Sequence, residues 1–460
     1  MDSASGGASA GSGGANPAAS GGRGGALGTA GSGGRSGSGG IPAAAGHGGD
    51  VASGGVPGSG GIRGSGGVSG SGGIRGSGGV PASGGASGAA GGPGGKTGHG
   101  GGTGATSAGG ATMTSAGPPE TKPLGYGQDT TGGGAAPAMQ ASSMAEVQAL
   151  IDAYSGSGGL TIRFTGHFDF STIPDPCTQW NLPAQIVEIK KKNDITLLGA
   201  DGSAANFGVH IASSSSNIIV RNMTFGLLPG GDAADAISLE GMSSGFPTDV
   251  WIDHNELFSS MATCPGAGDS SFDGLIDMKK GADKVTVSYN YVHDHHKVSL
   301  NGYSDSDTAV RHVTFHHNIF ENVGSRTPLQ RGGYSHLLNN TFDKVETSAI
   351  NVRMNGYTLV EGNYFSNVEN PLTSRDSSAL GFWELRNGNN VTGPADFATF
   401  GITWVASSST PTADATDWTT SAAFPVALGY TSPVDPAACV HAGLPKVAGA
   451  GKGLATLACK

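Results

Sequence analysis

Between about residues 222 and 368 the chain repeats a short run of alternating apolar and polar residues that ends in an asparagine. Four of these runs are TDVWIDHN, DKVTVSYN, RHVTFHHN and YTLVEGN, and they are rich in β-branched and aromatic residues. Alternation with a period of two is typical of a strand with one buried face. The pattern therefore predicts a series of short strands, and no helical period competes with it over this region.

The asparagines that close these runs recur at intervals that become regular. Asn255, Asn290, Asn318, Asn340 and Asn363 are separated by 35, 28, 22 and 23 residues. A spacing that settles near 22 residues is typical of a coil of constant length with insertions in its early turns. An asparagine at the same place in each turn can bond to its equivalents along a stack, which favours an all-β fold, a right-handed parallel β-helix.

One segment ahead of the repeats has a helical pattern instead. In SMAEVQALIDAYSG, Ser143 is a favoured N-cap residue and the apolar positions after it follow the spacing of an amphipathic helix. We expect this short N-terminal helix to cover an open end of the coil.

The first part of the chain differs in composition from the rest. From Met1 to about Gly117 it consists of phrases such as GSGGIRGSGGVSGSGG and contains no aromatic residue. Such a segment cannot bury enough apolar surface to offset the entropy lost on ordering. We therefore predict a disordered linker rich in Gly, Ser and Ala over residues 1–121 and one folded domain over residues 122–460.

Charge and cysteine usage narrow the class of protein. The formal net charge is -10 and no basic stripe is present, which argues against a nucleic-acid partner. No apolar run is long enough for a membrane span, and the first residues lack the apolar core of a signal peptide. Four cysteines without a CxxC pair indicate two disulfides and a secreted or cell-surface protein, with buried free thiols in a cytosolic protein as the alternative.

Paired carboxylates are the first candidate chemistry. SSFDGLIDMKKG places Asp273 and Asp277 four residues apart, and GGDAADAISLEG supplies Asp232 and Asp235 one or two coils earlier. Residues four apart in a strand share a face, so we expect Asp273 and Asp277 to project together into solvent. Like charges this close raise each other's pKa unless a cation compensates, and Ca²⁺, which takes hard oxygen ligands, is the simplest such cation. Ordinary surface aspartates are the alternative.

Basic residues recur at matching positions of successive repeats. Lys297 and Arg326 lie seven and eight residues after the asparagines of their repeats, and Arg331 and Arg353 each lie thirteen residues after theirs. If the coils stack, these side chains line one flank beside the aspartates and form a receptor for an acidic polymer. The alternative is that each basic residue pairs with a surface carboxylate and does nothing else.

Taken together, these segments resemble the pectate lyases of polysaccharide lyase family 1. The similarity runs from about Gly125 to the C-terminus and is carried by DVWIDHNELF, DGLIDMKKGADKVTVSYNYVHDHHKVSLNG, RHVTFHHNIFENVGSRTPLQRGG and NVRMNGYTLVEGNYF. The WIDH and RxPxxR motifs, in order and with a DxxxD pair between them, are highly specific. The resemblance implies a parallel β-helix and calcium-dependent cleavage of polygalacturonate by β-elimination.

The resemblance also assigns roles to individual residues. Arg326, the first arginine of RTPLQR, takes the place of the catalytic base, while Arg331 and Lys297 take the places of substrate-binding residues. The implied calcium ligands are Asp235, Asp273 and Asp277.

Other positions match the family less closely. Lys279 and Arg353 resemble lesser substrate contacts, and Asp253 in WIDH is expected to be structural. Ala233 stands where some relatives have a further aspartate, which puts a fourth protein ligand for calcium in doubt.

Disulfide pairing and competing functions complete the expectations. We predict Cys177 with Cys264 and Cys439 with Cys459, and a monomer because no sequence signal for oligomerisation exists. Three rival functions are a glycoside hydrolase, which needs an acid and base carboxyl pair that is not evident, a calcium-independent pectin lyase acting on methylated substrate, and a non-catalytic polysaccharide-binding β-helix.

Overall fold

The computed structural model describes residues 116–267, 271–406 and 411–459. Most of the predicted linker, residues 1–115, lies outside the described residues. Residues 116–121, at the end of that segment, lie against the C-terminal tail, where the backbone N–H of Gly117 donates to the carbonyl oxygen of Thr456 at 2.8 Å. No helix among the described residues is long and apolar enough to cross a membrane.

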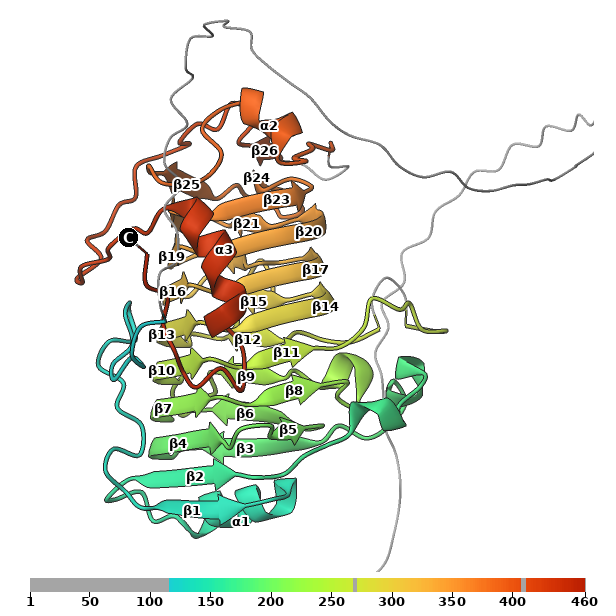
Figure 1. The fold of residues 1–460 in the computed structure, drawn as a ribbon, viewed down its shortest axis with the longest axis vertical. Helices are drawn as coiled ribbons and strands as arrows, with labels where there is room; N and C mark the ends of the chain where they lie inside the picture. Colours follow the sequence, from blue (N-terminus) through green and yellow to red (C-terminus); the bar gives the residue numbers. More distant parts are fainter. Residues whose placement is uncertain (1–115, 268–270, 407–410, 460) are drawn as a thin grey trace, which may run out of the picture. The chain divides into compact units, whose positions relative to one another are not determined.

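Three sheets, built almost entirely of parallel strands from successive coils, form the body of the domain (Figure 1). The ten-strand sheet consists of β1 (Ala138–Ala141), β2 (Leu160–Phe164), β4 (Asn193–Gly199), β7 (Ser216–Arg221), β10 (Thr248–Asp253), β13 (Asp283–Ser288), β16 (His312–His316), β19 (Tyr334–Leu338), β22 (Tyr357–Glu361) and β25 (Phe382–Leu385). The seven-strand sheet consists of β5 (Ala204–Ala205), β8 (Thr224–Gly226), β11 (Glu256–Phe258), β14 (Tyr291–Lys297), β17 (Ile319–Ser325), β20 (Thr341–Ser348) and β23 (Tyr364–Val368). The nine-strand sheet consists of β3 (Ile186–Lys190), β6 (Gly208–Ala212), β9 (Ile237–Glu240), β12 (Ile276–Lys279), β15 (Ser299–Asn301), β18 (Leu329–Arg331), β21 (Ile350–Arg353), β24 (Leu372–Ser374) and β26 (Ala413–Asp414).

The predicted parallel β-helix is confirmed. The four alternating runs of the sequence form β10, β13, β16 and β22, all in the ten-strand sheet. Neighbouring strands in all three sheets pair in parallel, except that the short β26 runs antiparallel to β24.

The interior is filled by apolar side chains that stack from coil to coil. The apolar residue two positions after each repeat asparagine lies in the seven-strand sheet and is fully buried: Leu257, Val292, Phe320, Phe342 and Phe365. The rings of Phe320 and Phe342 stack with centroids 5.2 Å apart, and those of Phe342 and Phe365 with centroids 4.8 Å apart. Each such burial contributes roughly 1.5–3 kcal/mol, so the stack is a major source of stability.

The predicted asparagine stack is also present. Each side-chain amide donates to the Oδ1 atom of the next asparagine, over 3.1 Å from Asn255 to Asn290 and 2.9 Å from Asn290 to Asn318. The series continues through Asn340 and Asn363. It ends at Asn389, which lies outside the sequence repeat, with a bond of 3.3 Å. These buried amides therefore satisfy one another along the bend between the ten-strand and seven-strand sheets.

Helices lie at the ends and on the outside of the coil. The capping helix is confirmed as α1 (Met144–Ala153), whose N-cap Ser143 accepts a hydrogen bond from the backbone N–H of Glu146. Figure 1 shows α1 beside β1 and β2 at one end of the stack, while α3 (Ala437–Val447) runs along the outside across several coils. The remaining helices are α2 (Ala395–Thr399) and the short 3₁₀ turns η1 (Phe170–Thr172), η2 (Pro176–Gln179) and η3 (Gly231–Ala233).

Both predicted disulfides are formed, Cys177 with Cys264 and Cys439 with Cys459. The second bridge ties α3 to the C-terminal tail. The first bridge joins η2 to the segment between β11 and β12, so it crosslinks two loops on the same side of the coil. That side also carries the carboxylates predicted to bind calcium.

Candidate active site

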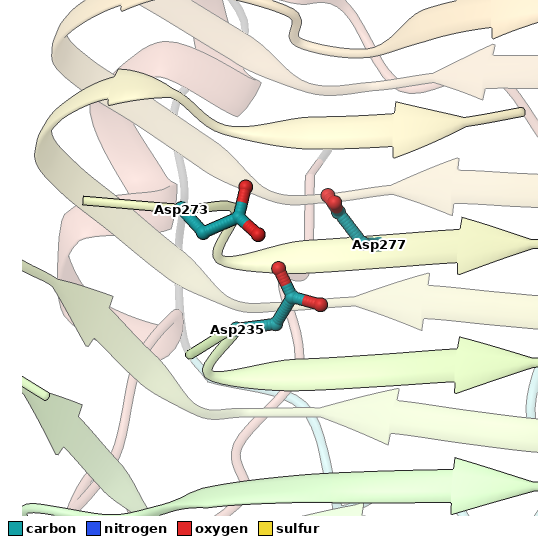
Figure 2. A group of neighbouring side chains, drawn as sticks. All are labelled: Asp235, Asp273 and Asp277. Atoms are coloured by element: carbon teal, nitrogen blue, oxygen red, sulfur yellow. The ribbon is translucent and has the colours of Figure 1, made fainter. Parts of the chain in front are cut away.

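Three aspartates meet at the beginning of β9 and β12 in the nine-strand sheet (Figure 2). Asp235 lies just before β9, Asp273 lies in the segment that leads into β12, and Asp277 lies within β12. One oxygen atom from each of the three carboxylates lies within 4.8 Å of the others. The structure therefore brings together the three residues that the sequence analysis assigned to calcium.

The expectation that Asp273 and Asp277 share a strand face and project together into solvent was wrong in two respects. Asp277 is only 1% exposed and does not project into open solvent. Asp273 is not part of the same strand, because β12 begins three residues later, at Ile276. The two side chains converge although only Asp277 lies in the strand, so they do not share a strand face. Asp232, the other candidate carboxylate, is exposed on η3 and lies outside the group.

Backbone contacts explain how the irregular segments converge. The N–H of Asp273 donates to the carbonyl oxygen of Gly231 at 3.2 Å, and the N–H of Ala236 donates to that of Gly274 at 3.2 Å. A Cβ atom at Gly274 would lie 2.2 Å from Oδ1 of Asp277, so only glycine allows this close approach. The carboxylates are thus fixed by two loops that hydrogen-bond to each other beside the sheet.

The electrostatics of the group suit a hard cation. Burial raises the pKa of Asp235 to about 6, with Lys279 opposing the rise and Asp273 adding to it. Burial and the neighbouring Asp235 raise the pKa of Asp277 well above its usual range. Oδ1 of Asp235 is buried without a hydrogen-bond partner among the described residues. Oxygen donors that repel one another and include an unpaired buried atom fit a divalent cation such as Ca²⁺.

Lys279 lies inside this carboxylate group. Its Nζ atom lies 2.8 Å from Oδ2 of Asp235 and 3.3 Å from Oδ2 of Asp277. Burial lowers the pKa of Lys279, but the attraction of Asp277 and Asp235 outweighs burial, so the pKa rises above its ordinary value. Lys279 is therefore an internal counter-charge of the carboxylates, a relationship that its position in the sequence did not reveal.

Arg326 and Lys297 form a second part of the site on neighbouring coils. Lys297 ends β14, and its Cα partner Ser325 ends β17, directly before Arg326. Neither side chain makes a hydrogen bond or an ion pair with another described residue. Burial and Arg331 lower the pKa of the Arg326 guanidinium, while Asp277 opposes the shift. Arg326 is thus a half-buried cation beside the carboxylates with no carboxylate bonded to it.

Arg331 and Arg353 are placed one above the other, as their spacing predicted. They are Cα partners in β18 and β21. Unlike Arg326, both are bonded: Nε of Arg331 lies 3.1 Å from Oδ1 of Asp305, and Nη2 of Arg353 lies 3.4 Å from Oδ2 of Asp376. Burial and Arg331 lower the pKa of Arg353 to about 10. The two alternatives considered for these residues are therefore compatible, because Arg331 and Arg353 are aligned on one flank of the coil and each also pairs with a carboxylate.

Two further residues support the site and were not identified from the sequence. Asp305 binds Arg331, and the buried His295 lies with Nε2 3.0 Å from the carbonyl oxygen of Lys297. Burial lowers the pKa of His295 to about 3, which favours a neutral ring that supports the backbone of Lys297 through this hydrogen bond. Asp253 of WIDH is fully buried in β10 with bonds to Arg221 and His254, in a different sheet from the site.

Comparisons with known proteins identify the family of this chain. The family model described as pectate lyase matches residues 103–453 of the chain. The chain is 44% identical over 349 residues to pectate lyase B of Dickeya chrysanthemi, covering 72% of this chain and 91% of that protein.

Solved structures extend the similarity to three dimensions. Pectate lyase II from Xanthomonas campestris pv. campestris is 54% identical with a TM-score of 0.68, over 72% of this chain and 99% of that one. Pectate lyase C from Erwinia chrysanthemi, solved at pH 9.5 with 30 mM Ca²⁺, is 40% identical with a TM-score of 0.68, over 74% of this chain and 99% of that one. A mutant of pectate lyase C in complex with pentagalacturonic acid is 39% identical with a TM-score of 0.67, over 73% of this chain and 97% of that one. The chain therefore belongs to the pectate lyase family and is a polysaccharide lyase.

Proposed function

We propose that this enzyme cleaves α-1,4-linked polygalacturonate by calcium-dependent β-elimination, with Arg326 as the base. The observation that carries the proposal is the contrast at the RTPLQR motif. Arg326 stands beside three clustered carboxylates with its guanidinium unbonded to any described residue, and its pKa is lowered chiefly by burial. A lowered pKa is what an arginine requires to accept a proton in alkaline medium, since its ordinary pKa is above about 12.

The reaction balances with the residues at hand. Neutral Arg326 removes the proton from C5 of a galacturonate unit, and the electron pair left behind forms the C4–C5 double bond. The bond from C4 to the glycosidic oxygen breaks, and that oxygen leaves and takes up a proton from solvent. The products are an unsaturated uronate at one new chain end and an ordinary hydroxyl at the other.

The difficulty of this step is the low acidity of C5, because its neighbouring carboxylate is already negative. A calcium ion held by Asp235, Asp273 and Asp277 would supply positive charge next to that carboxylate. Lys297 would donate to the same group from the adjoining coil. Both attractions strengthen as negative charge builds up in the transition state, so they lower the barrier and do not merely tighten binding.

The other basic residues would bind neighbouring uronates. Arg331 suits a substrate carboxylate because its guanidinium is always charged and its Nη2 atom bonds to none of the described residues. Lys279 and Arg353 also pair with protein carboxylates, but through the Nζ atom of Lys279 and the Nη2 atom of Arg353. We therefore assign them a secondary role, in which they add positive charge beside the substrate and bind it less directly.

The proposed substrate and location follow from related observations. The pectate lyase C mutant bound to pentagalacturonic acid supports polygalacturonate as the polymer. Two disulfides favour an oxidising compartment, in keeping with a secreted or cell-surface enzyme. We also propose that the enzyme acts as a monomer.

The test follows ultraviolet absorbance of the unsaturated product from polygalacturonate at alkaline pH, with added calcium or with EGTA. We expect the absorbance to rise only when calcium is present. In Arg326→Ala the rate of this rise should be at least 1,000-fold lower, which corresponds to an increase of about 4 kcal/mol in the activation barrier. Arg163→Ala, which removes an exposed arginine of β2, serves as the matched control and should leave the rate unchanged. New reducing ends without absorbance would overturn the proposal in favour of hydrolysis.

A further inference from the structure

The loop between β15 and β16, residues 302–311, holds Arg331 at three points. The carbonyl oxygen of Gly302 accepts from Nη1 of Arg331 at 2.8 Å, and Oδ1 of Asp305 accepts from Nε at 3.1 Å. Nη1 of Arg311 donates to the backbone carbonyl oxygen of Arg331 at 2.9 Å. One loop therefore fixes both the main chain and the side chain of this arginine.

The same loop is anchored independently of Arg331. Arg311 is fully buried and forms an ion pair with Asp307. The other oxygen of Asp307 accepts from the backbone N–H groups of Lys280 at 2.8 Å and Tyr303 at 3.1 Å. A buried ion pair with its remaining oxygen satisfied is costly to break, so Asp305 is presented from a rigid frame.

Asp305 also reaches the loop that follows β24. Its Oδ2 atom accepts from the backbone N–H of Ser378 at 2.8 Å and from the hydroxyl of Ser378 at 2.9 Å. The hydroxyl of Ser377 donates to Oδ1 at 2.7 Å. Burial raises the pKa of Asp305, but these bonds from Ser377 and Ser378, together with the bond from Arg331, outweigh burial and keep the pKa below its usual range. These bonds therefore favour the charged carboxylate form of Asp305.

The donors of Arg331 are consequently divided. Its Nε and Nη1 atoms bond to the loop, whereas its Nη2 atom bonds to none of the described residues. A guanidinium has five N–H donors in a fixed plane, and the bonds at Nε and Nη1, on two different edges, together fix that plane and determine where the Nη2 donors point.

We propose that Asp305 is the positioning residue for Arg331: it holds the guanidinium in the one orientation that leaves Nη2 for a uronate carboxylate. This inference rests on the proposed function, in which Arg331 binds polygalacturonate. It also explains how two arginines five residues apart differ in role, because the one with a carboxylate partner binds and the one without it accepts the proton.

The test is a double-mutant cycle of Asp305→Ala and Arg331→Ala, with steady-state kinetics on polygalacturonate at saturating calcium. We expect Asp305→Ala to raise KM about 10-fold while kcat changes less than about 3-fold, as for lost uniform binding. The double variant should be no worse than Arg331→Ala alone, because residues that act as one unit are not additive. Asp305→Asn, which keeps an acceptor for Nε, should recover part of the lost affinity.

Three outcomes separate the two proposals. If Arg331→Ala leaves KM and kcat unchanged, the role of Arg331 in the proposed function fails and the inference fails with it. If Arg331→Ala is impaired but Asp305→Ala is not, or if their effects multiply fully, only the positioning role is overturned. Calcium affinity and the thermal midpoint of unfolding are measured for every variant. If KM rises in both Asp305→Ala and Asp305→Asn in proportion to a lowered midpoint, the effect is a loss of stability and the positioning role is overturned.

Discussion

The ammonium of Lys279 lies 2.8 Å from Oδ2 of Asp235, inside the carboxylate group expected to bind calcium. If calcium binds as proposed, a fixed positive charge and a divalent cation share the same anionic group. The lysine would then limit repulsion between Asp235 and Asp277 when little calcium is available, and it would compete with calcium when the ion is abundant.

Replacing Lys279 by glutamine should thus separate these two effects. We expect Lys279→Gln to lower the free energy of unfolding in EGTA by about 2 kcal/mol, because buried carboxylates lose their counter-charge. Added calcium should raise the thermal midpoint more in this variant than in the wild type. Differential scanning calorimetry with EGTA and with calcium measures both quantities.

Lys280→Gln is the matched control, since Lys280 is the adjacent residue but is half exposed and pairs with Glu240 at the surface. It should leave both midpoints nearly unchanged. Equal responses of the two variants to calcium would show that Lys279 does not act on the carboxylate group.

The Cys177–Cys264 disulfide should contribute to calcium affinity as well as to stability. Cys177 belongs to η2, which is followed by Trp180, and the Trp180 ring packs against Gly231. Gly231 in turn accepts the backbone hydrogen bond of Asp273. We therefore expect loss of the bridge to loosen the loop that carries Asp273, one of the three proposed calcium ligands.

We expect Cys177→Ala with Cys264→Ala to weaken calcium binding about 5-fold or more and to cost roughly 3 to 5 kcal/mol of stability. Titration with Tb³⁺ or calorimetry with Ca²⁺ gives the affinity. Removal of the other bridge, Cys439 with Cys459, is the control, because it should lower the stability without changing the affinity. Equal affinity in both double variants would rule out the supporting role of the first bridge.

Gly274→Ala should disrupt the carboxylate group directly. The added methyl would lie 2.2 Å from Oδ1 and 2.5 Å from Cγ of the buried Asp277, so the carboxylate of Asp277 must move away from its position. We expect calcium affinity to fall at least 10-fold, about 1.4 kcal/mol. Gly393→Ala, where a Cβ meets open space, should bind calcium as the wild type does.

Glu120 should make stability fall as the pH rises. Burial and the nearby Asp253 raise its pKa to about 8, against an ordinary value of 4.5, with Arg221 opposing. Between these two pH values the unfolded chain has released the proton and the folded chain retains it. Unfolding therefore becomes more favourable with each step in pH, and the effect levels off above pH 8.

Glu120→Gln removes this titration. In urea unfolding we expect the free energy of unfolding of the wild type to fall by about 2 kcal/mol or more between pH 5 and pH 8. The variant should not show this decrease. Glu346→Gln, a substitution of an exposed glutamate, should retain the wild-type dependence. Parallel pH curves for the wild type and Glu120→Gln would contradict the assignment.

The sequence predicts those features that recur in every coil. Asn318 and Asn340 occupy the same place in successive turns, so their stacking, the strand periodicity and the alignment of Arg331 with Arg353 could be inferred from spacing alone. The contacts of Asp305 with Ser377 and Ser378 could not, because they join loops 72 and 73 residues apart that follow no repeat.

Burial was the other property beyond reach of the sequence. Asp277 alternates with apolar neighbours as an exposed residue would, yet it is covered by the loops that carry Asp235 and Asp273. Insertions in the early coils supply those loops, and their packing depends on single contacts such as Trp180 against Gly231. Lys279 likewise gave no sign that it binds the carboxylates.

The uniform stacking of the coils makes each turn a unit of length. Neighbouring strands are about 4.8 Å apart, so every additional turn of some 22 residues extends the binding face by one such step. If the polymer lies along the nine-strand sheet, the length of polymer that is bound changes in steps of one turn. Duplication or loss of a turn beyond β21 would lengthen or shorten the stretch of chain that is held, while the aspartates and Arg326 on the earlier turns would keep their mutual geometry. In such an architecture, the length of polymer that is bound and the cleavage chemistry can evolve separately.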